Sequence, residues 1–235
     1  MRSSARADRR VTLTGQAPIW HTRGMPVAVH HVDHPLIADA LVRVRDVGTP
    51  NALFRQELDR IGGLLLAEAT RHLPTRPVRV TTPLMETDGQ VLVSQPVVVP
   101  VLRAGLGFLA AAQQLFPNCD IGFVGVSRDE TTFQPKQYVN KLPEHLAGRQ
   151  CIVLDPMLAT GGSHAHTCRL LIDAGATGTI IVVCVLAAPE GIAVLEQAGL
   201  DIALYTAAGD VRLNEHAFIE PGLGDAGDRQ FGSPA

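Results

Sequence analysis

The sequence predicts an α/β fold, with an open, mostly parallel sheet flanked by helices. Between residues 97 and 205, short apolar runs typical of buried strands alternate with segments of helical period. Two of these runs, 97–102 and 151–154, are each followed by a charged residue and a glycine-containing loop. Ligands of open parallel sheets bind at this carboxyl edge of the strands. The 235 residues are enough for one such domain with a full core.

Composition and charge narrow the function classes. Hydrophobic residues make up 46% of the chain and charged residues 18%, as in globular proteins. The formal net charge of -3 gives no general attraction to nucleic acid or anionic membranes, so we expect neither as a partner. The longest apolar run, 180–188, is about half of the ~20 residues that a membrane helix needs. The four cysteines are widely spaced and form no CxxC pair, which argues against a zinc site or a disulfide framework.

Residues 1–24 are expected to form a flexible extension, and residues 25–235 the domain. The first part of the chain shows no periodicity and carries five Arg within 23 positions. It lacks the apolar segment of a secretory signal, so we expect a cytoplasmic location. The neighbouring His30 and His31 have no third ligand at useful spacing, which favours solvent or a strand edge over a metal site.

Two helices are predicted next, as scaffold or interface. Asp33 or His34 could cap the first helix, and apolar residues recur at helical spacing over 51–72 in the second. Gly62 and Gly63 inside the second helix each cost about 1 kcal/mol relative to Ala. The pair therefore predicts close packing against a neighbouring helix or subunit.

A small β-arm that projects from the core is predicted between Arg79 and Val93. Short alternating segments, with Pro83 and Gly89 among them, are typical of such an arm.

The strand predicted at 97–102 leads into Arg103 and a turn that contains Gly105 and Gly107. One interpretation is a tight turn with Arg103 facing solvent. The other places Arg103 beside the strand that ends at Asp155, where a guanidinium suits a highly charged leaving group.

A strand from Ile121 to Ser127 is followed by Arg128 and a polar segment that reaches Lys141. Its composition is that of a mobile flap, although its charges could belong to a solvated loop. Closure of a flap over a site would keep water away from a reactive intermediate.

The stretch 151–163, CIVLDPMLATGGS, is the centre of the predicted site. Its apolar strand ends at Asp155, and two glycines and Ser163 precede a helical pattern. The first N–H groups of a helix have no internal partner and attract anions, and Thr160 and Ser163 can add hydroxyl donors. An ordinary strand-to-helix turn with Ser163 as the N-cap is the alternative.

Asp155 favours the anion site, because a bare phosphate needs no carboxylate whereas ribose hydroxyls donate to one. The stretch therefore predicts a site for a phosphorylated ribose. It lacks the Lys of a Walker P-loop and the GxGxxG of a dinucleotide fold.

A strand at 179–187, a helix at 189–198 and a strand at 202–205 continue the alternation. The last 25 residues break it, but they carry apolar anchors that disordered tails lack. These anchors are Phe218, Ile219, Leu223 and Phe231.

The segment VLDPMLATGGS resembles the phosphoribosyl pyrophosphate loop of the type I phosphoribosyltransferases, in the form of the uracil phosphoribosyltransferase family, where a proline follows the single acid. Three further stretches are similar to the same family. They are VPVLRAGLGF (99–108), GVSRDETTFQP (125–135) and NEHAFIEPGLGDAGDRQFG (214–232). The resemblance covers residues 32–235, and its last stretch is typical of uracil as the base.

The resemblance implies the type I phosphoribosyltransferase fold with a C-terminal base-binding hood. The implied reaction converts uracil and 5-phospho-α-D-ribose 1-diphosphate (PRPP) to UMP and diphosphate. Asp155, Asp225 and Arg103 are the expected catalytic residues. The expected PRPP-binding residues are Arg103, Arg128, Asp155, Pro156, Met157, Leu158, Ala159, Thr160, Gly161, Gly162, Ser163 and Asp225. The expected uracil-binding residues are Ile219, Gly224, Asp225 and Ala226.

The resemblance also implies a homodimer or higher homo-oligomer and, in some members, a GTP effector. We expect Mg²⁺ to be held mainly by substrate oxygens, since the sequence offers no dedicated metal cage.

Uracil presents an acceptor, a donor and an acceptor along O4, N3–H and O2. Main-chain groups between Ile219 and Ala226 could form the complementary hydrogen bonds. The nearest side-chain amide, Gln230, lies past the Gly-rich turn. A competing hypothesis is a regulator of the same fold that binds RNA and senses uridine nucleotides. Such a regulator would need a basic face for RNA, and the negative formal net charge of the chain argues against one.

Overall fold

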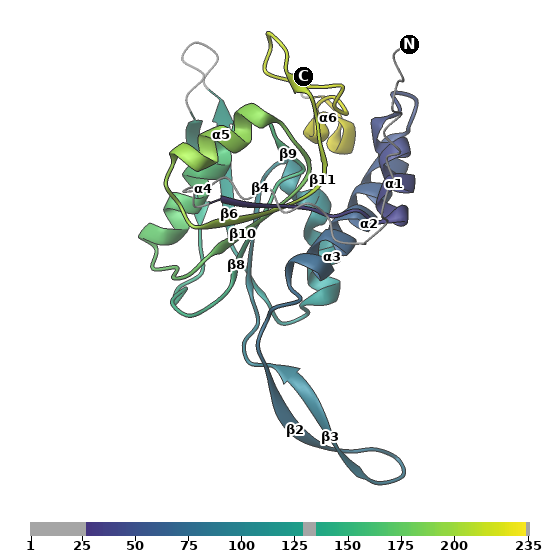
Figure 1. The fold of residues 1–235 in the computed structure, drawn as a ribbon, viewed down its shortest axis with the longest axis vertical. Coiled ribbons are helices and arrows are strands. Elements are labelled where there is room, and N and C mark those ends of the chain that lie inside the picture. Colours follow the sequence, from purple (N-terminus) through teal and green to yellow (C-terminus); the bar gives the residue numbers. More distant parts are fainter. Residues whose placement is uncertain (1–26, 129–134, 234–235) are drawn as a thin grey trace, which may run out of the picture.

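The computed structural model describes residues 27–128 and 135–233 (Figure 1), so the predicted N-terminal extension lies outside the described residues. A nine-stranded sheet has the order β1-β11-β10-β8-β4-β6-β7, with β5 paired to β4 and β9 to β10. All of its pairs are parallel except β6–β7. Its strands are β1 (Val27–His31), β4 (Val97–Leu102), β5 (Asp120–Ile121), β6 (Phe123–Arg128), β7 (Pro135–Lys141), β8 (Cys151–Leu154), β9 (Met157–Leu158), β10 (Ile180–Ala187) and β11 (Ile202–Gly209).

Helices cover both faces of this sheet, which confirms the predicted fold class. They are α1 (Pro35–Arg45), α2 (Asn51–Ala69), the 3₁₀ helix η1 (Ala104–Phe108), α3 (Leu109–Leu115), α4 (Gly162–Asp173), α5 (Pro189–Gln197) and α6 (Ala226–Phe231). Ile152 and Leu154 of β8 pack in the core beneath α1, α2 and α3, whereas Val153 faces α4 and α5. This alternation follows from the period of two of a strand.

The helix α1 begins where the sequence predicts, because the His34 ring accepts a hydrogen bond from the Leu36 N–H at 3.1 Å. The helix α2 ends at Ala69, three residues before the predicted end. Gly62 packs closely as expected: a Cβ added there would lie 2.4 Å from Cδ1 of Phe108. The close neighbour of α2 at this point is therefore η1.

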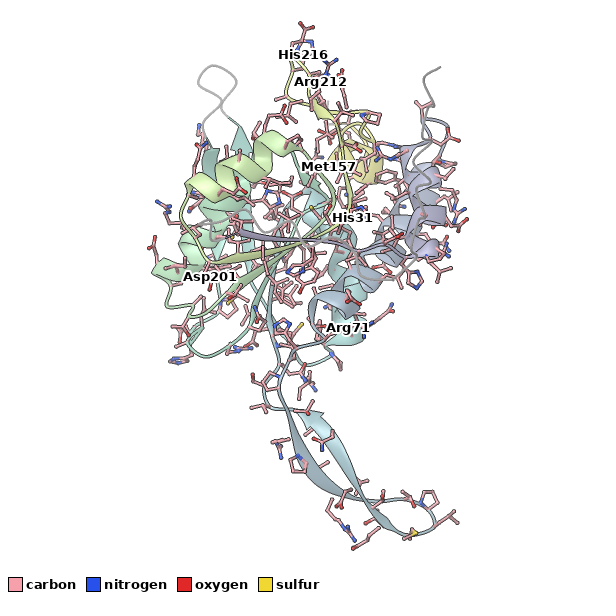
Figure 2. All side chains as sticks on the ribbon, viewed as in Figure 1. His31, Arg71, Met157, Asp201, Arg212 and His216 are labelled. Atoms are coloured by element: carbon pink, nitrogen blue, oxygen red, sulfur yellow. The ribbon has the colours of Figure 1, made fainter. Side chains whose placement is uncertain are left out.

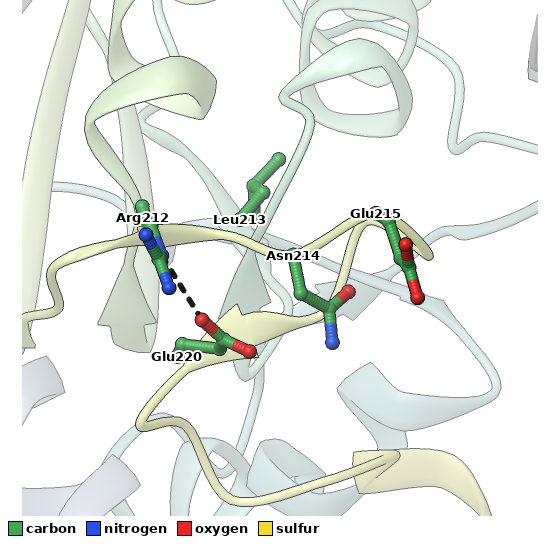
Figure 3. Close-up of a pocket in the computed structure, with 5 residues that line it drawn as sticks. All are labelled: Arg212, Leu213, Asn214, Glu215 and Glu220. Carbon is green, nitrogen blue, oxygen red and sulfur yellow. Dashed lines mark hydrogen bonds and ion pairs between the residues drawn. The ribbon is translucent and has the colours of Figure 1, made fainter.

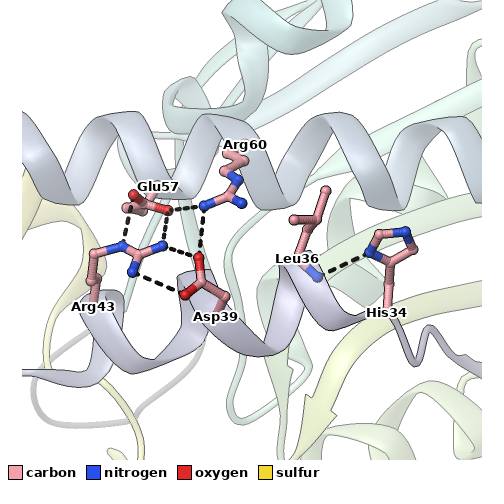
Figure 4. A network of polar contacts seen from close by, with 6 residues as sticks. All are labelled: His34, Leu36, Asp39, Arg43, Glu57 and Arg60. Carbon is pink, nitrogen blue, oxygen red and sulfur yellow. Dashed lines mark hydrogen bonds and ion pairs between the residues drawn. The ribbon is translucent and has the colours of Figure 1, made fainter.

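A polar network joins α1 to α2 (Figure 4). Nε of Arg43 lies 2.8 Å from Oε1 of Glu57, and Nη1 of Arg60 lies 3.1 Å from Oδ2 of Asp39. Because Glu57 is buried, its charge needs these two guanidinium groups. The network fixes the helix pair that supports the C-terminal segment.

The strand β1 was not predicted. It pairs in parallel with β11 along the edge of the sheet, and the His30 ring stacks on Tyr205 at 4.4 Å between centroids. This agrees with the strand-edge interpretation of the histidines. The strand β11 also continues to Gly209 instead of ending at Tyr205, and it pairs with β10 over this extension.

The predicted β-arm is present and slightly longer than expected. It consists of β2 (Thr75–Thr81) and β3 (Glu86–Leu92), which pair only with each other and project away from the body (Figure 1). Leu84 and Met85 in its turn are 95% and 70% exposed. The arm thus carries apolar side chains into solvent.

Among the described residues, no helix is long and apolar enough to cross a membrane.

Candidate active site

The ends of two neighbouring strands bring Arg103 and Asp155 to the same edge of the sheet. The strands β4 and β8 pair in parallel, with Pro100 opposite Leu154. Asp155 directly follows β8, and Arg103 directly follows β4. The predicted juxtaposition of the two strand ends is therefore confirmed.

The Asp155 side chain is only 13% exposed. The pKa of its carboxyl group is raised to about 7, mainly by burial. The Met157 N–H, which donates to Oδ1 at 3.4 Å, acts to lower this pKa, and the charge of Asp225 acts to raise it. Oδ2 lies 3.7 Å from Nε2 of the buried His164. Asp155 is thus a desolvated carboxyl group at the carboxyl edge of the sheet.

The loop after Asp155 is positioned mainly by its backbone. The β9 segment adds onto β10, and the Leu158 side chain is fully buried in the core. Met157 lies between the strand ends and the C-terminal segment (Figure 2), packed against the core cluster that contains Ile219. Leu158 can therefore meet a ligand only through its main chain.

Gly161, and not Ser163, is the N-cap of α4. Its φ of 76° lies in the left-handed region, and it makes no side-chain cap, so the first N–H groups of α4 remain available to an anion. A Cβ at Gly161 would lie 2.5 Å from the carbonyl oxygen of Gly191. Glycine is therefore required here both by the turn and by the contact with α5.

The C-terminal segment 210–233 folds over the strand ends, and we call it the hood. Its small sheet pairs β12 (Arg212–Leu213) with β13 (Ile219–Glu220). The Arg45 guanidinium lies 2.6 Å from Asp210 and donates to the carbonyl of Gly222 at 2.8 Å. These contacts fasten the hood to α1.

The apolar anchors of the hood are only partly as predicted. Ile219 and Leu223 are buried in the core, but Phe218 and Phe231 are 44% and 46% exposed. Arg229 supplies additional fastening: it lies 4.3 Å from the ring centroid of Phe54 and donates to the Leu223 carbonyl at 2.9 Å.

Asp225 and its neighbours form the start of α6. Asp225 is the N-cap, and its Oδ1 accepts from the Asp228 N–H at 2.8 Å. Oδ1 of Asp228 in turn lies 2.8 Å from Nη2 of Arg103. Gly224 adopts a φ of 79°, and the carbonyl of Ala226 accepts from the Gln230 side chain.

Sequence reasoning missed two residues at this site. Gln230 is fully buried and donates through Nε2 to the carbonyls of Ala104 and Ala226, at 3.0 and 2.8 Å, so it joins η1 to the hood. His164 is 2% exposed and faces Asp155. The position of His164 directly after Ser163, in the first turn of the predicted helix, was the available signal.

Arg128 ends β6, where its backbone pairs with Pro135, and its side chain and residues 129–134 of the predicted flap lie outside the described residues. The strand β7 reaches Lys141 as the second strand of this hairpin.

A pocket of about 370 Å³ lies on the hood (Figure 3). Its lining residues are Arg212, Leu213, Asn214, Glu215 and Glu220. Nε of Arg212 is paired with Glu220 at 3.0 Å. None of the predicted substrate-binding residues lines this pocket, and with two carboxylates beside one paired guanidinium it is poorly suited to a polyanion.

Among the described residues, no three His, Cys, Asp or Glu side chains come together as a metal-binding group.

A parallel sheet with a buried Asp and a Gly-rich loop after one central strand, an Arg turn after its neighbour and a hood above them is the arrangement of a type I phosphoribosyltransferase. The comparisons narrow this class. The family model "Uracil phosphoribosyltransferase" matches residues 31–233. This chain belongs to the uracil phosphoribosyltransferase family.

Named relatives agree with this membership, and a solved structure shares the fold. A uracil phosphoribosyltransferase of Nocardioides sp. is 50% identical over 208 residues, which are 86% of this chain and 97% of the relative. That of Corynebacterium diphtheriae is 47% identical over 201 residues, covering 86% and 95%. The AQ2163 protein from Aquifex aeolicus superposes with a TM-score of 0.82 at 35% identity, covering 87% of this chain and 98% of that one.

Proposed function

We propose that the protein transfers the 5-phosphoribosyl group of PRPP to uracil, yielding UMP and diphosphate in uracil salvage. The observation that carries this proposal is the meeting of the Asp155 loop, the Arg103 turn and the Asp225 cap at one edge of the sheet. Family membership supports the choice of uracil as the acceptor.

The loop from Ala159 to Ser163 binds the 5-phosphate through the first N–H groups of α4. Asp155 accepts hydrogen bonds from the ribose hydroxyls, and Pro156 and Met157 pass beside the sugar. Arg103 and Arg128 neutralise the diphosphate as it leaves.

Catalysis is then mainly positioning and electrostatic stabilisation of a dissociative, oxocarbenium-like ribose. The charge of Asp225 raises the pKa of Asp155, which supports a role for Asp225 beside the ribose. We assign Asp225 to assist at the ribose or the base.

Mg²⁺ fits this site as a substrate-held ion. Two nearby acids, Asp155 and Asp225, are fewer ligands than a protein cage uses, whereas the PRPP oxygens supply the hard donors that the ion prefers. When bound, it offsets the diphosphate charge. Chelation of Mg²⁺ with EDTA should abolish turnover, and added Mg²⁺ should restore it.

The hood reads the base through its backbone. A carbonyl of Ile219 or Gly224 accepts from N3–H of uracil, and N–H groups between Gly224 and Ala226 donate to its oxygens. The carbonyl of Ala226 is already used by Gln230, so this residue offers its N–H. The small side chains let a flat ring approach the main chain.

The decisive experiment incubates purified protein with uracil, PRPP and Mg²⁺ and measures UMP and diphosphate. Formation of both in equal amounts is the expected result. UMP binding without turnover, together with binding of single-stranded RNA, would instead identify an RNA-binding regulator of the same fold.

We further propose a homodimer or higher homo-oligomer, for which the exposed Leu84 and Met85 on the arm give a physical reason. Light scattering on the full chain tests this, and replacement of both residues by Ser should weaken association. A GTP effect on turnover, and a cytoplasmic location in fractionated cells, are tested separately.

A further inference from the structure

His164 is a buried polar residue to which the mechanism so far gives no task. It lies in the first turn of α4, two positions after the first helical residue Gly162. It is 2% exposed, and its Nε2 has no hydrogen-bond partner among the described residues. Buried polar atoms without partners are uncommon and costly, so this one needs an explanation.

Oδ2 of Asp155 lies 3.7 Å from this nitrogen, and the two form a contact between a carboxyl group and an imidazole. The other carboxyl oxygen, Oδ1, accepts from the Met157 N–H. A hydrogen bond from nitrogen to oxygen is about 2.9 Å long, so a shift of about 0.8 Å would close the gap. One oxygen of Asp155 is thus held by its own loop and the other faces the imidazole.

We propose that His164 is a positioning residue for Asp155, donating from Nε2–H to Oδ2 so that the carboxylate is held ionised and oriented toward the ribose hydroxyls. This inference rests on the proposed function, because the orientation matters only if Asp155 binds ribose. A neutral imidazole with its proton on Nε2 is a donor of the required kind.

The surroundings explain why Asp155 needs such a donor. Burial and the charge of Asp225 from the hood both raise the pKa of Asp155, and among the described residues the Met157 N–H opposes them. From β10, the Cys184 thiol also faces this carboxyl, and burial is the main reason that its own pKa is raised to about 12. Cys184 therefore stays neutral, so no thiolate adds negative charge beside Asp155.

The same burial keeps His164 itself neutral, since it lowers the pKa of the imidazole to about 4. His164 therefore acts as a fixed hydrogen-bond donor at neutral pH and carries no charge of its own there. A donor that remains neutral favours the ionised carboxylate without itself becoming a second buried ion.

Two substitutions separate this role from simple packing. His164→Leu fills a similar volume without a donor, and His164→Gln keeps an N–H donor. Leu171→Ala is the matched control, because Leu171 is fully buried on the same helix and packs in the core. It should lower thermal stability and leave the ionisation of Asp155 unchanged.

The first measurement is steady-state kinetics with PRPP varied, from about pH 5.5 to 9. His164→Leu should lower kcat/KM for PRPP about tenfold to a hundredfold at neutral pH. The acid limb of its pH–rate profile, where the rate rises as Asp155 ionises, should move to higher pH. His164→Gln should restore most of the rate and the position of the limb. The phosphates of PRPP titrate alike for every variant, so they cannot cause a difference between them.

The second measurement needs no turnover. The ¹³C carboxyl resonance of Asp155, assigned through Asp155→Asn, reports its titration midpoint in the protein without substrate. The midpoint should rise in His164→Leu and stay unchanged in Leu171→Ala. An unchanged midpoint in His164→Leu overturns the proposed contact. If the midpoint shifts but wild-type protein makes no UMP, the contact stands and the proposed function fails.

Discussion

Arg103 and Asp228 form an ion pair in which Nη2 lies 2.8 Å from Oδ1, linking the turn after β4 to the first turn of α6. A guanidinium has further N–H donors on the same plane, so Arg103 can keep this partner and still face the crevice. The pair therefore orients Arg103 before substrate arrives.

Arg103→Lys should show whether the planar arrangement of the guanidinium donors contributes to PRPP turnover in addition to the positive charge. A lysine ammonium is a point charge and cannot hold Asp228 and a diphosphate in one plane. We expect kcat/KM for PRPP to fall by about 10², with the KM for uracil nearly unchanged. Kinetics with each substrate varied in turn test this. Wild-type kcat/KM in a folded lysine variant would show that charge alone suffices.

Asp155→Asn keeps the side-chain shape and removes the charge that accepts from ribose hydroxyls. Loss of a charge-assisted hydrogen bond in a transition state costs about 2 to 4 kcal/mol, or roughly 10² to 10³ in rate. We expect that decrease in kcat/KM, measured at neutral pH. The assignment of Asp155 to the ribose is wrong if a folded variant retains a near-normal rate.

The buried pair of Asp155 and His164 should make the pH dependence of stability differ between single variants. His164→Leu leaves Asp155, whose pKa is already raised from 3.8 to about 7 in the wild-type protein and should rise further without the imidazole. Its stabilisation is therefore complete below pH 3.8 and is lost as pH rises through 7 and above. Asp155→Asn leaves His164, whose pKa is lowered from 6.5 to about 4, so its stabilisation is present above pH 6.5 and is lost as pH falls through 4.

Between pH 4 and 6.5, these slopes oppose each other and largely cancel in the wild-type protein. Relative to wild type, the free energy of unfolding should therefore fall with rising pH in His164→Leu and increase in Asp155→Asn. Urea denaturation of the three proteins across this range measures both slopes. If the free energy of unfolding depended on pH in the same way in all three proteins, Asp155 and His164 would not be a buried pair with shifted pKa values.

The selectivity of the enzyme for its base tests the proposal that main-chain groups of the hood recognise uracil. Cytosine has an amino group in place of O4 and lacks the N3 proton. A backbone N–H of the hood would then face the amino group, and a backbone carbonyl would face the unprotonated N3, so donor would meet donor and acceptor would meet acceptor. Such mismatches give discrimination of about 10⁴ or more. We expect no measurable turnover of cytosine and normal acceptance of 5-fluorouracil. Comparable kcat/KM for uracil and cytosine would rule out this reading.

Ala226→Pro removes one N–H from the hood in a position that suits proline. Ala226 is the first residue of α6, and the preceding Asp225 is extended, with φ of -76° and ψ of 113°. We expect KM for uracil to rise at least tenfold while PRPP binding stays near normal. Equal losses for both substrates would instead indicate a general collapse of the hood.

Residues 1–24 should be dispensable, given their composition. A chain that begins at Met25 should keep its melting temperature and its turnover. A decrease of several degrees would show that this segment packs on the domain.

The sequence predicts the sheet and the strand-end loops because these features depend on local patterns. The apolar runs of β4, β8 and β10 and the residues that follow them are contiguous in the chain. The strand β1 could not be identified in this way, because its pairing with β11 joins segments that are far apart in sequence.

The same reason explains the misjudged site residues. Gln230 looked remote because it lies beyond a Gly-rich turn, but its amide reaches the carbonyl of Ala104, 126 residues earlier. The patterns also cannot say which of four apolar anchors are buried, and Phe218 and Phe231 proved to be half-exposed.

The fastening of the hood has a consequence for biosynthesis. Arg45 of α1 is made early, yet its partner Asp210 follows 165 residues later. At about 5 to 20 residues per second, the ribosome needs roughly ten to thirty seconds to reach it. Throughout that interval the nascent chain can assemble β4, η1 and the first helices while the hood is still missing. On the proposed reading of the base by the hood, selectivity for uracil is therefore acquired last, when the final residues leave the ribosome.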